Sequence, residues 1–296
     1  MRVFVTGATG FVGSATVQEL LKAGHKVLGL ARSDAGADAL AAMGAEVLRG
    51  NLEDLDSLRR GVAQADGVIH TGFNHDFSKF KDNCETDRRA IEAMGMELVG
   101  SDRPLIVTSG IGLVQPGRVA TEDVPPASNP SIPRVSEQAA DAAAEKGARV
   151  SIIRLPPSVH GAGDHGFVPI LIGIARQKGA SVYTGEGLNC WPAVHRFDAA
   201  RLYRLVLEKG RGGARYHAVA EAGVPFREVA GVIGRRLGVP VVSKAPEESA
   251  AHFGWFAHFA AIDNEASSAL TRQELGWEPT QAGLIEDIDQ PVYFQG

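Results

Sequence analysis

The chain has 296 residues, a formal net charge of −5 and only two cysteines, Cys84 and Cys190. Its negative charge argues against a nucleic-acid partner, and no apolar run approaches the roughly 18 residues of a membrane span. Two cysteines give no disulfide framework, which fits a reducing compartment. The chain starts inside a strand-like segment, so we find no signal peptide. We expect a cytoplasmic protein that acts on a small molecule, with no nucleic-acid or membrane partner.

The first 30 residues have the pattern of a dinucleotide-binding unit. Residues 3–5 predict a buried strand, residues 14–23 a helix and residues 26–30 a second strand. Between the first strand and the helix, Gly7, Gly10 and Gly13 are spaced G-x-x-G-x-x-G. Such glycines allow a tight turn and a close approach of backbone to a pyrophosphate, which the free N–H groups of the helix receive. The predicted cofactor loop consists of Gly7, Thr9, Gly10, Phe11, Val12 and Gly13.

The end of the second strand favours NADP over NAD. An NAD site usually has Asp or Glu about 20 residues beyond the glycines, where it holds the ribose hydroxyls. Here the chain has Arg32 and Ser33, and the first carboxylate is Asp34. A guanidinium and a hydroxyl suit a 2′-phosphate. Alternatively, Arg32 is a solvated surface residue, Asp34 caps the next helix, and the cofactor is NAD.

Strands and helices alternate as far as residue 154, which predicts a parallel sheet covered on both faces. The expected fold is α/β, a Rossmann-type doubly wound parallel sheet with a smaller C-terminal lobe over the substrate. Ligands of such sheets bind outside the carboxyl ends of the strands. This rule brings residues 71–73, 108–110 and 156–158 around one crevice, with Thr108 among the cofactor contacts.

Several motifs resemble the extended short-chain dehydrogenase/reductase superfamily of the epimerase/dehydratase type. They lie at residues 6–13, 50–54, 154–161, 194–198 and 275–277. The resemblance implies an NAD(P) cofactor held by the glycine loop, and a homodimer is expected only from the family. It places Asn51 and Leu52 near adenine and Thr71, Gly72 and Phe73 along the ribose. Leu155, Pro156 and Ser158 would lie at the nicotinamide end.

The family's Tyr-x-x-x-Lys pair is absent. No Tyr in the chain is followed four positions later by Lys, and the aligned places hold Pro133 and Glu137. Proline cannot transfer a proton, and Glu has the wrong charge to lower the pKa of a phenol. The chain therefore resembles the atypical members that lack the active-site tetrad.

Another residue must then stabilise or protonate the oxygen or nitrogen that receives charge. The catalytic candidates are Ser109 at the end of the fifth strand, and His160 and His165 beside the presumed nicotinamide segment. His160 could instead be bonded and inert. The other histidines nearby do not have the spacing of a zinc site, so we predict no metal.

Two functions remain open. The first is an NAD(P)-dependent oxidoreductase that reduces a small, hydrophobic carbonyl or imine compound with a non-standard proton donor. The second is a non-catalytic NAD(P)-binding sensor that reports the cofactor state to a protein partner.

The expected dinucleotide-binding domain covers residues 1–165, and residues 194–220 return to it. Residues 166–193 and 221–290 form the smaller lobe. The last residues, 291–296, resemble a protease-site remnant of an expression tag, and we leave them out of the fold argument.

Overall fold

The computed structural model describes residues 1–113, 119–126 and 133–295. Its centre is a seven-stranded sheet in which every adjacent pair of strands is parallel. In spatial order the strands are β10 (Arg215–His217), β6 (Arg149–Leu155), β5 (Pro104–Gly110), β4 (Gly67–His70), β1 (Arg2–Thr6), β2 (Lys26–Ala31) and β3 (Glu46–Arg49). The order reverses between β1 and β4, and a ligand of such a sheet binds at this reversal.

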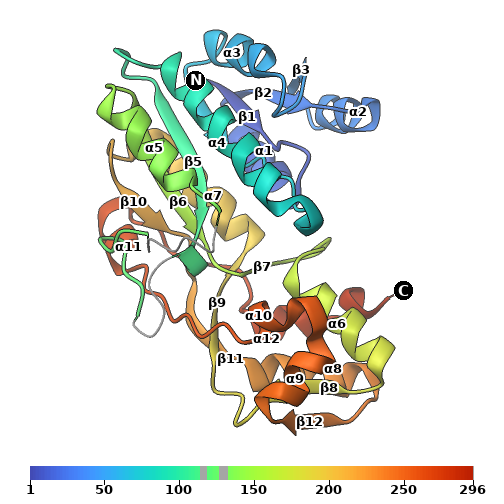
Figure 1. The fold of residues 1–296 in the computed structure, drawn as a ribbon. Coiled ribbons are helices and arrows are strands. Elements are labelled where there is room, and N and C mark those ends of the chain that lie inside the picture. Colours follow the sequence, from blue (N-terminus) through green and yellow to red (C-terminus); the bar gives the residue numbers. More distant parts are fainter. Residues whose placement is uncertain (114–118, 127–132, 296) are drawn as a thin grey trace.

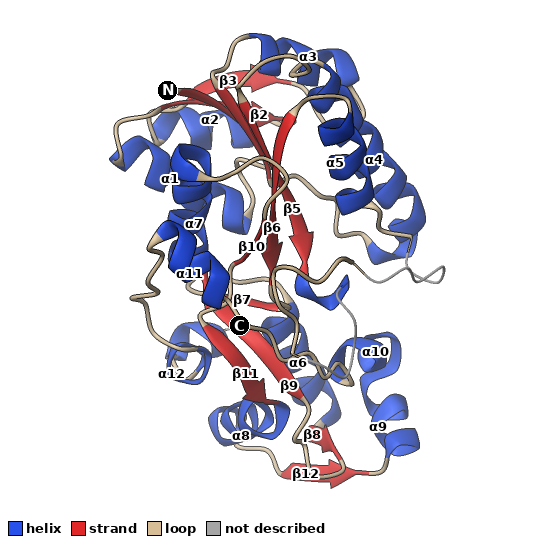
Figure 2. Ribbon diagram, turned by 90° about the vertical axis from the view of Figure 1, so that its left-hand side faces the viewer, coloured by secondary structure: helices blue, strands red, loops and turns tan. Residues whose placement is uncertain are grey.

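Helices cover both faces of this sheet, as Figure 2 shows. On one face lie α1 (Phe11–Lys22), α2 (Asp34–Ala42) and α7 (Arg196–Lys209). On the other lie α3 (Leu55–Ala63), α4 (Phe80–Met96) and α5 (Ser136–Glu145). Strand β1 shows why two layers form, because Val3 and Val5 enter one apolar core and Phe4 enters the other. This arrangement confirms the predicted doubly wound fold.

The smaller lobe is built from segments on either side of β10 in the chain and lies at one end of the large sheet (Figure 1). It contains a three-stranded sheet of β11 (Glu221–Pro225), β9 (Cys190–His195) and β7 (Ser158–His160), and a parallel pair of β12 (Val241–Lys244) and β8 (Ser181–Thr184). Its helices are α6 (Phe167–Lys178), α8 (Phe226–Leu237), α9 (Pro246–Phe253), α10 (Ala257–Ala260) and α12 (Leu284–Ile288). Helix α11 (Ala269–Leu275) instead lies beside α7 and β10.

The segments that link the two parts cross between them more than once. Helix α7 packs on α1, and β10 extends the large sheet beside β6. Strand β7 falls inside the range expected for the dinucleotide-binding domain, yet it pairs with β9 of the three-stranded sheet. Short 3-10 turns complete the chain: η1 (Phe77–Lys79), η2 (Ile111–Leu113), η3 (Gly254–Phe256) and η4 (Pro291–Phe294). No helix in the described ranges has both the length and the apolar character that crossing a membrane requires.

Candidate functional site

The backbone of the glycine loop between β1 and α1 packs too closely to admit side chains at Gly7 and Gly13. A Cβ on Gly13 would lie 2.0 Å from the Gly7 carbonyl oxygen, and one on Gly7 would lie 2.6 Å from the Gly72 nitrogen. Gly7 also has a φ of 64°, which other residues rarely adopt. Helix α1 begins after Gly10 with no side-chain cap and no acidic residue in its first turn. Its free N–H groups can therefore receive the diphosphate of a dinucleotide.

Arg196 adds a positive charge beside the start of α1, which the sequence reasoning did not predict. Its Nη2 donates to Ser14 Oγ at 2.8 Å, and its guanidinium lies 4.4 Å from the centre of the Phe11 ring. Its Nη1 donates to the Ala162 carbonyl oxygen at 3.0 Å. Arg196 thus joins α1 to the loop after β7 and leaves a cation near the predicted phosphates.

The second-strand end carries more positive charge than the sequence indicated. Arg32 and Ser33 follow β2 as expected, and Arg49 at the end of β3 donates to the Ser33 carbonyl oxygen and, at 2.8 Å, to Asp34 Oδ1. Ser33, not Asp34, caps α2, because its hydroxyl accepts from the Gly36 N–H at 3.2 Å. The Ser33 hydroxyl proton stays available to an anion.

The remaining cofactor candidates lie along the carboxyl ends of the strands. Leu52 and Thr6 flank Gly72, since a Cβ there would meet a Leu52 methyl and Thr6 Oγ1 at 3.1 Å each. Asn51 Oδ1 accepts from the N–H groups of residues 53 and 54 and so fixes its own turn. Thr71 and Thr108 bond neighbouring carbonyl oxygens, and Phe73 is half-buried.

The nicotinamide end has a buried polar atom that the protein does not satisfy. Leu155 and Pro156 lead into β7, where Ser158 is buried. The Ser158 hydroxyl has no hydrogen-bond partner among the described residues. A buried hydroxyl without a partner is costly, and a bound polar group would satisfy it. These residues and the glycine loop fit a dinucleotide.

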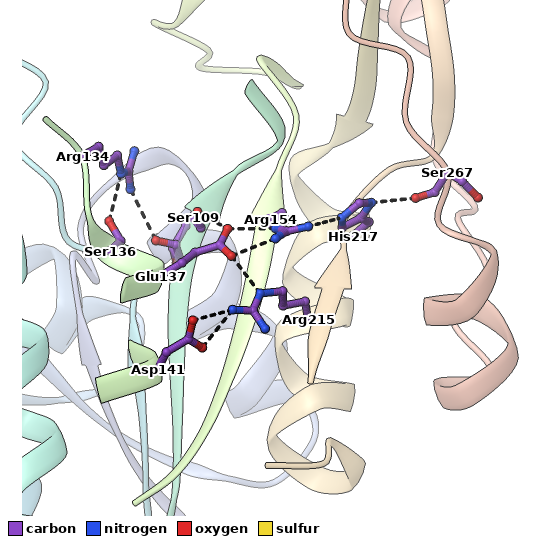
Figure 3. Close-up of polar contacts among 10 residues, drawn as sticks. Ser109, Arg134, Ser136, Glu137, Asp141, Arg154, Arg215, His217 and Ser267 are labelled. Carbon is purple, nitrogen blue, oxygen red and sulfur yellow. Dashed lines mark hydrogen bonds and ion pairs between the residues drawn. The ribbon is translucent and has the colours of Figure 1, made fainter. Parts of the chain in front are cut away.

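Ser109, the predicted catalytic hydroxyl, is bonded to another side chain of the protein. It is buried, and its hydroxyl donates to Glu137 Oε1 at 2.8 Å. The same carboxylate accepts from Arg154 Nε and Nη2, each at 2.8 Å, and from Arg215 Nε at 2.9 Å. Figure 3 shows these side chains pointing toward one another across α5, β5, β6 and β10. Glu137, which the resemblance aligns with the family's Lys, is the centre of this ion network.

The charges within this network are fixed by mutual contact. Burial alone would raise the pKa of Glu137, but the bonds and charge of Arg154, and then the bonds from Arg215 and Ser109, lower it. His217 accepts from Arg154 at its Nε2, 3.2 Å away, while its Nδ1 lies 2.7 Å from the Ser267 carbonyl oxygen. Desolvation lowers the pKa of His217 to about 4, so the ring is neutral near pH 7.

His160 is also enclosed, and this position argues against the predicted direct role. The residue is 1% exposed, and its Nδ1 lies 2.9 Å from Asp287 Oδ2. Asp287 accepts a further bond from Tyr293 at 2.6 Å, and the Tyr293 hydroxyl accepts from the Gly161 N–H at 2.8 Å. Tyr293 belongs to the segment left out as a tag remnant, and here it contributes contacts to the fold.

His165 is the predicted catalytic residue that the structure leaves exposed. Its ring packs edge-on against Phe11, 5.8 Å between centres, in the first turn of α1. His75, after β4, is also exposed. Desolvation, and then the charges of Arg134 and His165, lower the pKa of His75. His75 therefore lies within reach of the charges of Arg134 and His165.

Aromatic side chains line the boundary between the large domain and the lobe. Phe77 lies 5.8 Å from Phe80 and 5.8 Å from Trp255, and 5.5 Å from Phe259, measured between ring centres. Trp255 is 61% exposed. By contrast, Trp191 is fully buried in the lobe core. We name Phe73, Phe77, Phe80, Trp255 and Phe259 the aromatic cluster.

The histidines grouped in the sequence do not form one metal-binding group. His70 is buried between Thr6 and Asp87, and His160 pairs with Asp287. Within residues 1–113, 119–126 and 133–295, no three His, Cys, Asp or Glu side chains are placed to hold an ion.

Comparison with known proteins gives one family. The model of the NAD dependent epimerase/dehydratase family matches residues 3–220. The chain is 53% identical over 298 residues to the "uncharacterized protein C2A9.02" of Schizosaccharomyces pombe, covering 99% of this chain and 100% of that protein. It is 28% identical to the sterol-4-alpha-carboxylate 3-dehydrogenase of Dictyostelium discoideum, covering 76% of this chain and 73% of the relative.

A bacterial reductase and a solved structure extend the comparison. The 2-alkyl-3-oxoalkanoate reductase of Stenotrophomonas maltophilia is 28% identical, with 83% of this chain and 78% of the relative covered. The crystal structure of DesIV, a dTDP-glucose 4,6-dehydratase from Streptomyces venezuelae, superimposes with a TM-score of 0.79 at 22% identity. That superposition covers 99% of this chain and 97% of DesIV, and it shows a shared fold.

Proposed function

Because the chain belongs to the NAD-dependent epimerase/dehydratase family, we propose that it is an NADPH-dependent oxidoreductase that reduces a small apolar carbonyl or imine compound. The observation that carries the proposal is the exposed His165, which packs against Phe11 in the first turn of α1. His75 lies within reach of the charges of His165 and Arg134, and the aromatic cluster begins next to His75. A protein that only held the cofactor would need neither a proton donor nor an apolar surface at this place.

The cofactor preference rests on the ends of β2 and β3. Arg32, Ser33 and Arg49 offer two guanidinium groups and a hydroxyl, and a 2′-phosphate takes charge-assisted bonds from such donors. Arg49 is partly neutralised by Asp34, which is itself almost fully exposed. The arrangement favours NADPH over NADH and leaves NADH as the weaker ligand.

The substrate class rests on the aromatic cluster and on the relatives. The bacterial reductase acts on 2-alkyl-3-oxoalkanoates and the amoebal relative on a sterol carboxylate, both of which carry extended apolar parts. The half-buried rings of the aromatic cluster can pack against such a body.

The chain's own residues supply binding and a proton. The bound cofactor would supply the hydride. His165, exposed beside α1, donates a proton to the substrate oxygen or nitrogen as negative charge develops there. His75, whose pKa is lowered first by desolvation, is the alternative, as a hydrogen-bond donor that stabilises this charge through its N–H group. Ser109 has no part in this step, because its proton is held by Glu137.

The buried Glu137 network supports a second candidate function, that of a non-catalytic NAD(P)-binding sensor. It fills the place of the family's proton-transfer pair with a structural ion network, as expected of a protein that has lost catalysis. A non-catalytic NAD(P)-binding sensor would bind the cofactor and turn over nothing.

Titration with NADPH and NADH, followed by NADPH oxidation against carbonyl and imine compounds, tests the proposal. We expect tighter binding of NADPH and oxidation on apolar substrates. Arg49→Ala should weaken NADPH binding and leave NADH binding unchanged. Arg59→Ala is the matched control, since Arg59 is equally exposed and pairs with Asp56 as Arg49 pairs with Asp34.

The outcomes separate the two functions. Tight NADPH binding without oxidation of any compound would favour the sensor. No binding of either nucleotide would contradict the proposed cofactor. For the proton donor, His165→Gln should lower the turnover number at least about tenfold. His25→Gln should not, because His25 precedes β2 at the amino end of the sheet, opposite the predicted site.

A further inference from the structure

Arg134 places a cation at the carboxyl edge of the large sheet. It precedes α5 by two residues and is half-buried. Its Nε donates to Ser136 Oγ at 3.0 Å, and its Nη2 lies 3.4 Å from the Thr108 carbonyl oxygen. The guanidinium lies 4.3 Å from the centre of the Phe73 ring, in a cation–π contact. Arg134 thus lies where β4 and β5 end, beside the Glu137 network in Figure 3 but not part of it.

A buried chain of hydrogen bonds fixes Ser136, the residue that accepts a bond from Arg134. Ser136 donates to Asp87 Oδ2 at 2.5 Å, and Asp87 Oδ1 lies 3.1 Å from His70 Nε2. His70 Nδ1 in turn lies 2.7 Å from Thr6 Oγ1, at the start of the glycine loop. Because the Ser136 proton goes to Asp87, the Ser136 oxygen is free to accept from Arg134. The side chain is therefore oriented before any ligand arrives.

Arg134 forms no ion pair with a carboxylate among the residues that the structure describes. Among the described residues no Asp or Glu lies within 4.0 Å of its guanidinium, and residues 114–118 and 127–132 contain neither Asp nor Glu. The nearby Asp87 already accepts from His70 and Ser136. A fixed guanidinium beside the Phe73 ring, with no carboxylate in direct contact, favours binding of an anion from outside.

The aromatic cluster extends away from this cation toward the lobe. Phe73 lies 6.2 Å from Phe80, and Phe80 lies 5.8 Å from Phe77, which contacts Trp255. One molecule can therefore lie with a polar end at Arg134 and an apolar, planar body along these rings. Building on the proposed function, we infer that the substrate is a planar or extended apolar carbonyl compound that carries a carboxylate, and that Arg134 binds this carboxylate.

Binding of two matched probes tests the inference without turnover. Isothermal titration calorimetry with 2-naphthoate and with neutral 2-naphthamide compares one aromatic body with and without the charge, with NADP present and absent. The wild type should bind 2-naphthoate at least about tenfold more tightly, as expected for a charge-assisted bond. Arg134→Gln should abolish this preference, whereas Arg89→Gln, which removes an exposed charge from α4, should keep it.

Each contrary result overturns the inference. Equal binding of the two probes by the wild type, or a preserved preference in Arg134→Gln, would show that Arg134 does not bind the carboxylate. An equal loss of NADP affinity and naphthoate affinity in Arg134→Gln would assign the residue to the cofactor. If Arg134→Gln does not fold, Arg134→Met keeps packing on Phe73 and removes the charge.

The failure of this inference differs from failure of the proposed function. Oxidation of NADPH by neutral ketones, with equal binding of both probes, would leave a reductase without a carboxylate site. A preference for 2-naphthoate without NADPH oxidation on any compound would leave an anion site and contradict the reductase.

Discussion

At Ser109, the direction of one hydroxyl proton distinguishes a structural residue from a catalytic one. The sequence places Ser109 at the carboxyl end of the fifth strand, where a catalytic hydroxyl is expected. In the structure its proton goes to Glu137, which four donor bonds from Ser109, Arg154 and Arg215 satisfy. A buried carboxylate satisfied in this way keeps its charge and its position. Ser109 therefore acts as one donor in an ion network.

Substitutions in this network should change stability more than turnover. We expect Ser109→Ala to lower the free energy of unfolding by about 1 kcal/mol, because it removes one hydrogen bond to a buried acceptor. The turnover number should stay unchanged. Glu137→Gln should lower the free energy of unfolding by about 3–5 kcal/mol, because it leaves buried Arg154 without its charge partner. Urea denaturation and NADPH oxidation measure both effects, and loss of turnover in a folded Ser109→Ala would restore Ser109 as a catalytic residue.

His217 should make the folded state sensitive to acid. Its pKa falls from 6.5 to about 4 on folding, so between these values the unfolded chain binds a proton that the folded chain does not. Stability is therefore lost as the pH falls below 6.5. From pH 7 to pH 5 the contribution of His217 is about 2 kcal/mol. His217→Gln should lower stability at pH 7 yet lose about 2 kcal/mol less than the wild type on going to pH 5, as measured by urea denaturation. Equal losses would contradict the buried neutral ring.

The contacts of Arg134 and Arg49 could not be predicted from the sequence. Arg134 adjoins Pro133, the place of the missing Tyr, and Arg49 ends the strand after the one that carries Arg32. A cation at a strand or helix end was the available signal. The role of each cation depends on a contact with a residue that is distant in sequence. Arg134 contacts Phe73, and Arg49 bonds to Ser33. Ser109, Glu137, Arg154 and Arg215 are likewise brought together only by the order of the strands.

At the scale of elements, the start of α1 could be predicted because the residues that determine it are neighbours in sequence. The glycine spacing, the strand before it and the helix after it lie within one short stretch, and Gly7 and Gly13 are each needed for a close backbone approach. The helix begins at Phe11, three residues before the expected start, because Gly10 serves as its cap without a side chain. The regular alternation of strands and helices likewise predicted the parallel sheet.

The strands of the lobe were harder to predict, because they pair with segments that are distant in sequence. Strand β7 has three residues and pairs with β9 and, through it, β11, which are distant in sequence. Such short strands are too brief to show an alternation of apolar and polar residues. Trp191 of β9 and Val224 of β11 are buried in the lobe core, whereas Val159 of β7 packs against the core of the large domain. The lobe core explains why Trp191 and Phe256 are buried whereas Trp255 is exposed.

Two helical glycines provide a matched pair for the cofactor loop. An Ala at Gly13 would place its Cβ 2.0 Å from the Gly7 carbonyl oxygen, whereas one at Gly173 in α6 would meet nothing within 4 Å. We expect Gly13→Ala to abolish NADPH binding and lower the melting temperature. Gly173→Ala should leave NADPH binding unchanged and raise the free energy of unfolding by about 0.5–1 kcal/mol, since Ala favours a helix. Calorimetric titration and thermal denaturation check both. Normal NADPH affinity in Gly13→Ala would remove the glycine loop from the cofactor site.

At the scale of the whole molecule, the two parts meet along the aromatic cluster. Phe77 of the large domain contacts Trp255 and Phe259 of the lobe. Through Phe80 and Phe73 the same cluster reaches Arg134 at the carboxyl edge of the large sheet. A ligand at that edge would therefore touch both parts, and its affinity would depend on lobe residues that are far from the glycine loop.

Adjacent aromatic residues in the lobe separate binding from stability. Trp255 is 61% exposed and Phe256 is fully buried in the lobe core. We expect Trp255→Ala to raise the dissociation constant of 2-naphthamide about 3- to 10-fold, the loss of one aromatic contact, with a change in unfolding free energy below about 1 kcal/mol. Phe256→Ala should lower that free energy by about 3–5 kcal/mol. Calorimetric titration and urea denaturation measure the two quantities.

The opposite pattern would change the assignment of the aromatic cluster. If Trp255→Ala bound 2-naphthamide as the wild type does, its exposed ring would serve another purpose, and the apolar body of the substrate would have to lie elsewhere. If it destabilised the fold as much as Phe256→Ala, its contacts with Phe77 and Phe259 would be part of the packing that holds the lobe to the sheet. Weakened binding in a stable protein is the result expected if the lobe contributes directly to substrate recognition, because an exposed ring gains most of its contact area only when a ligand covers it.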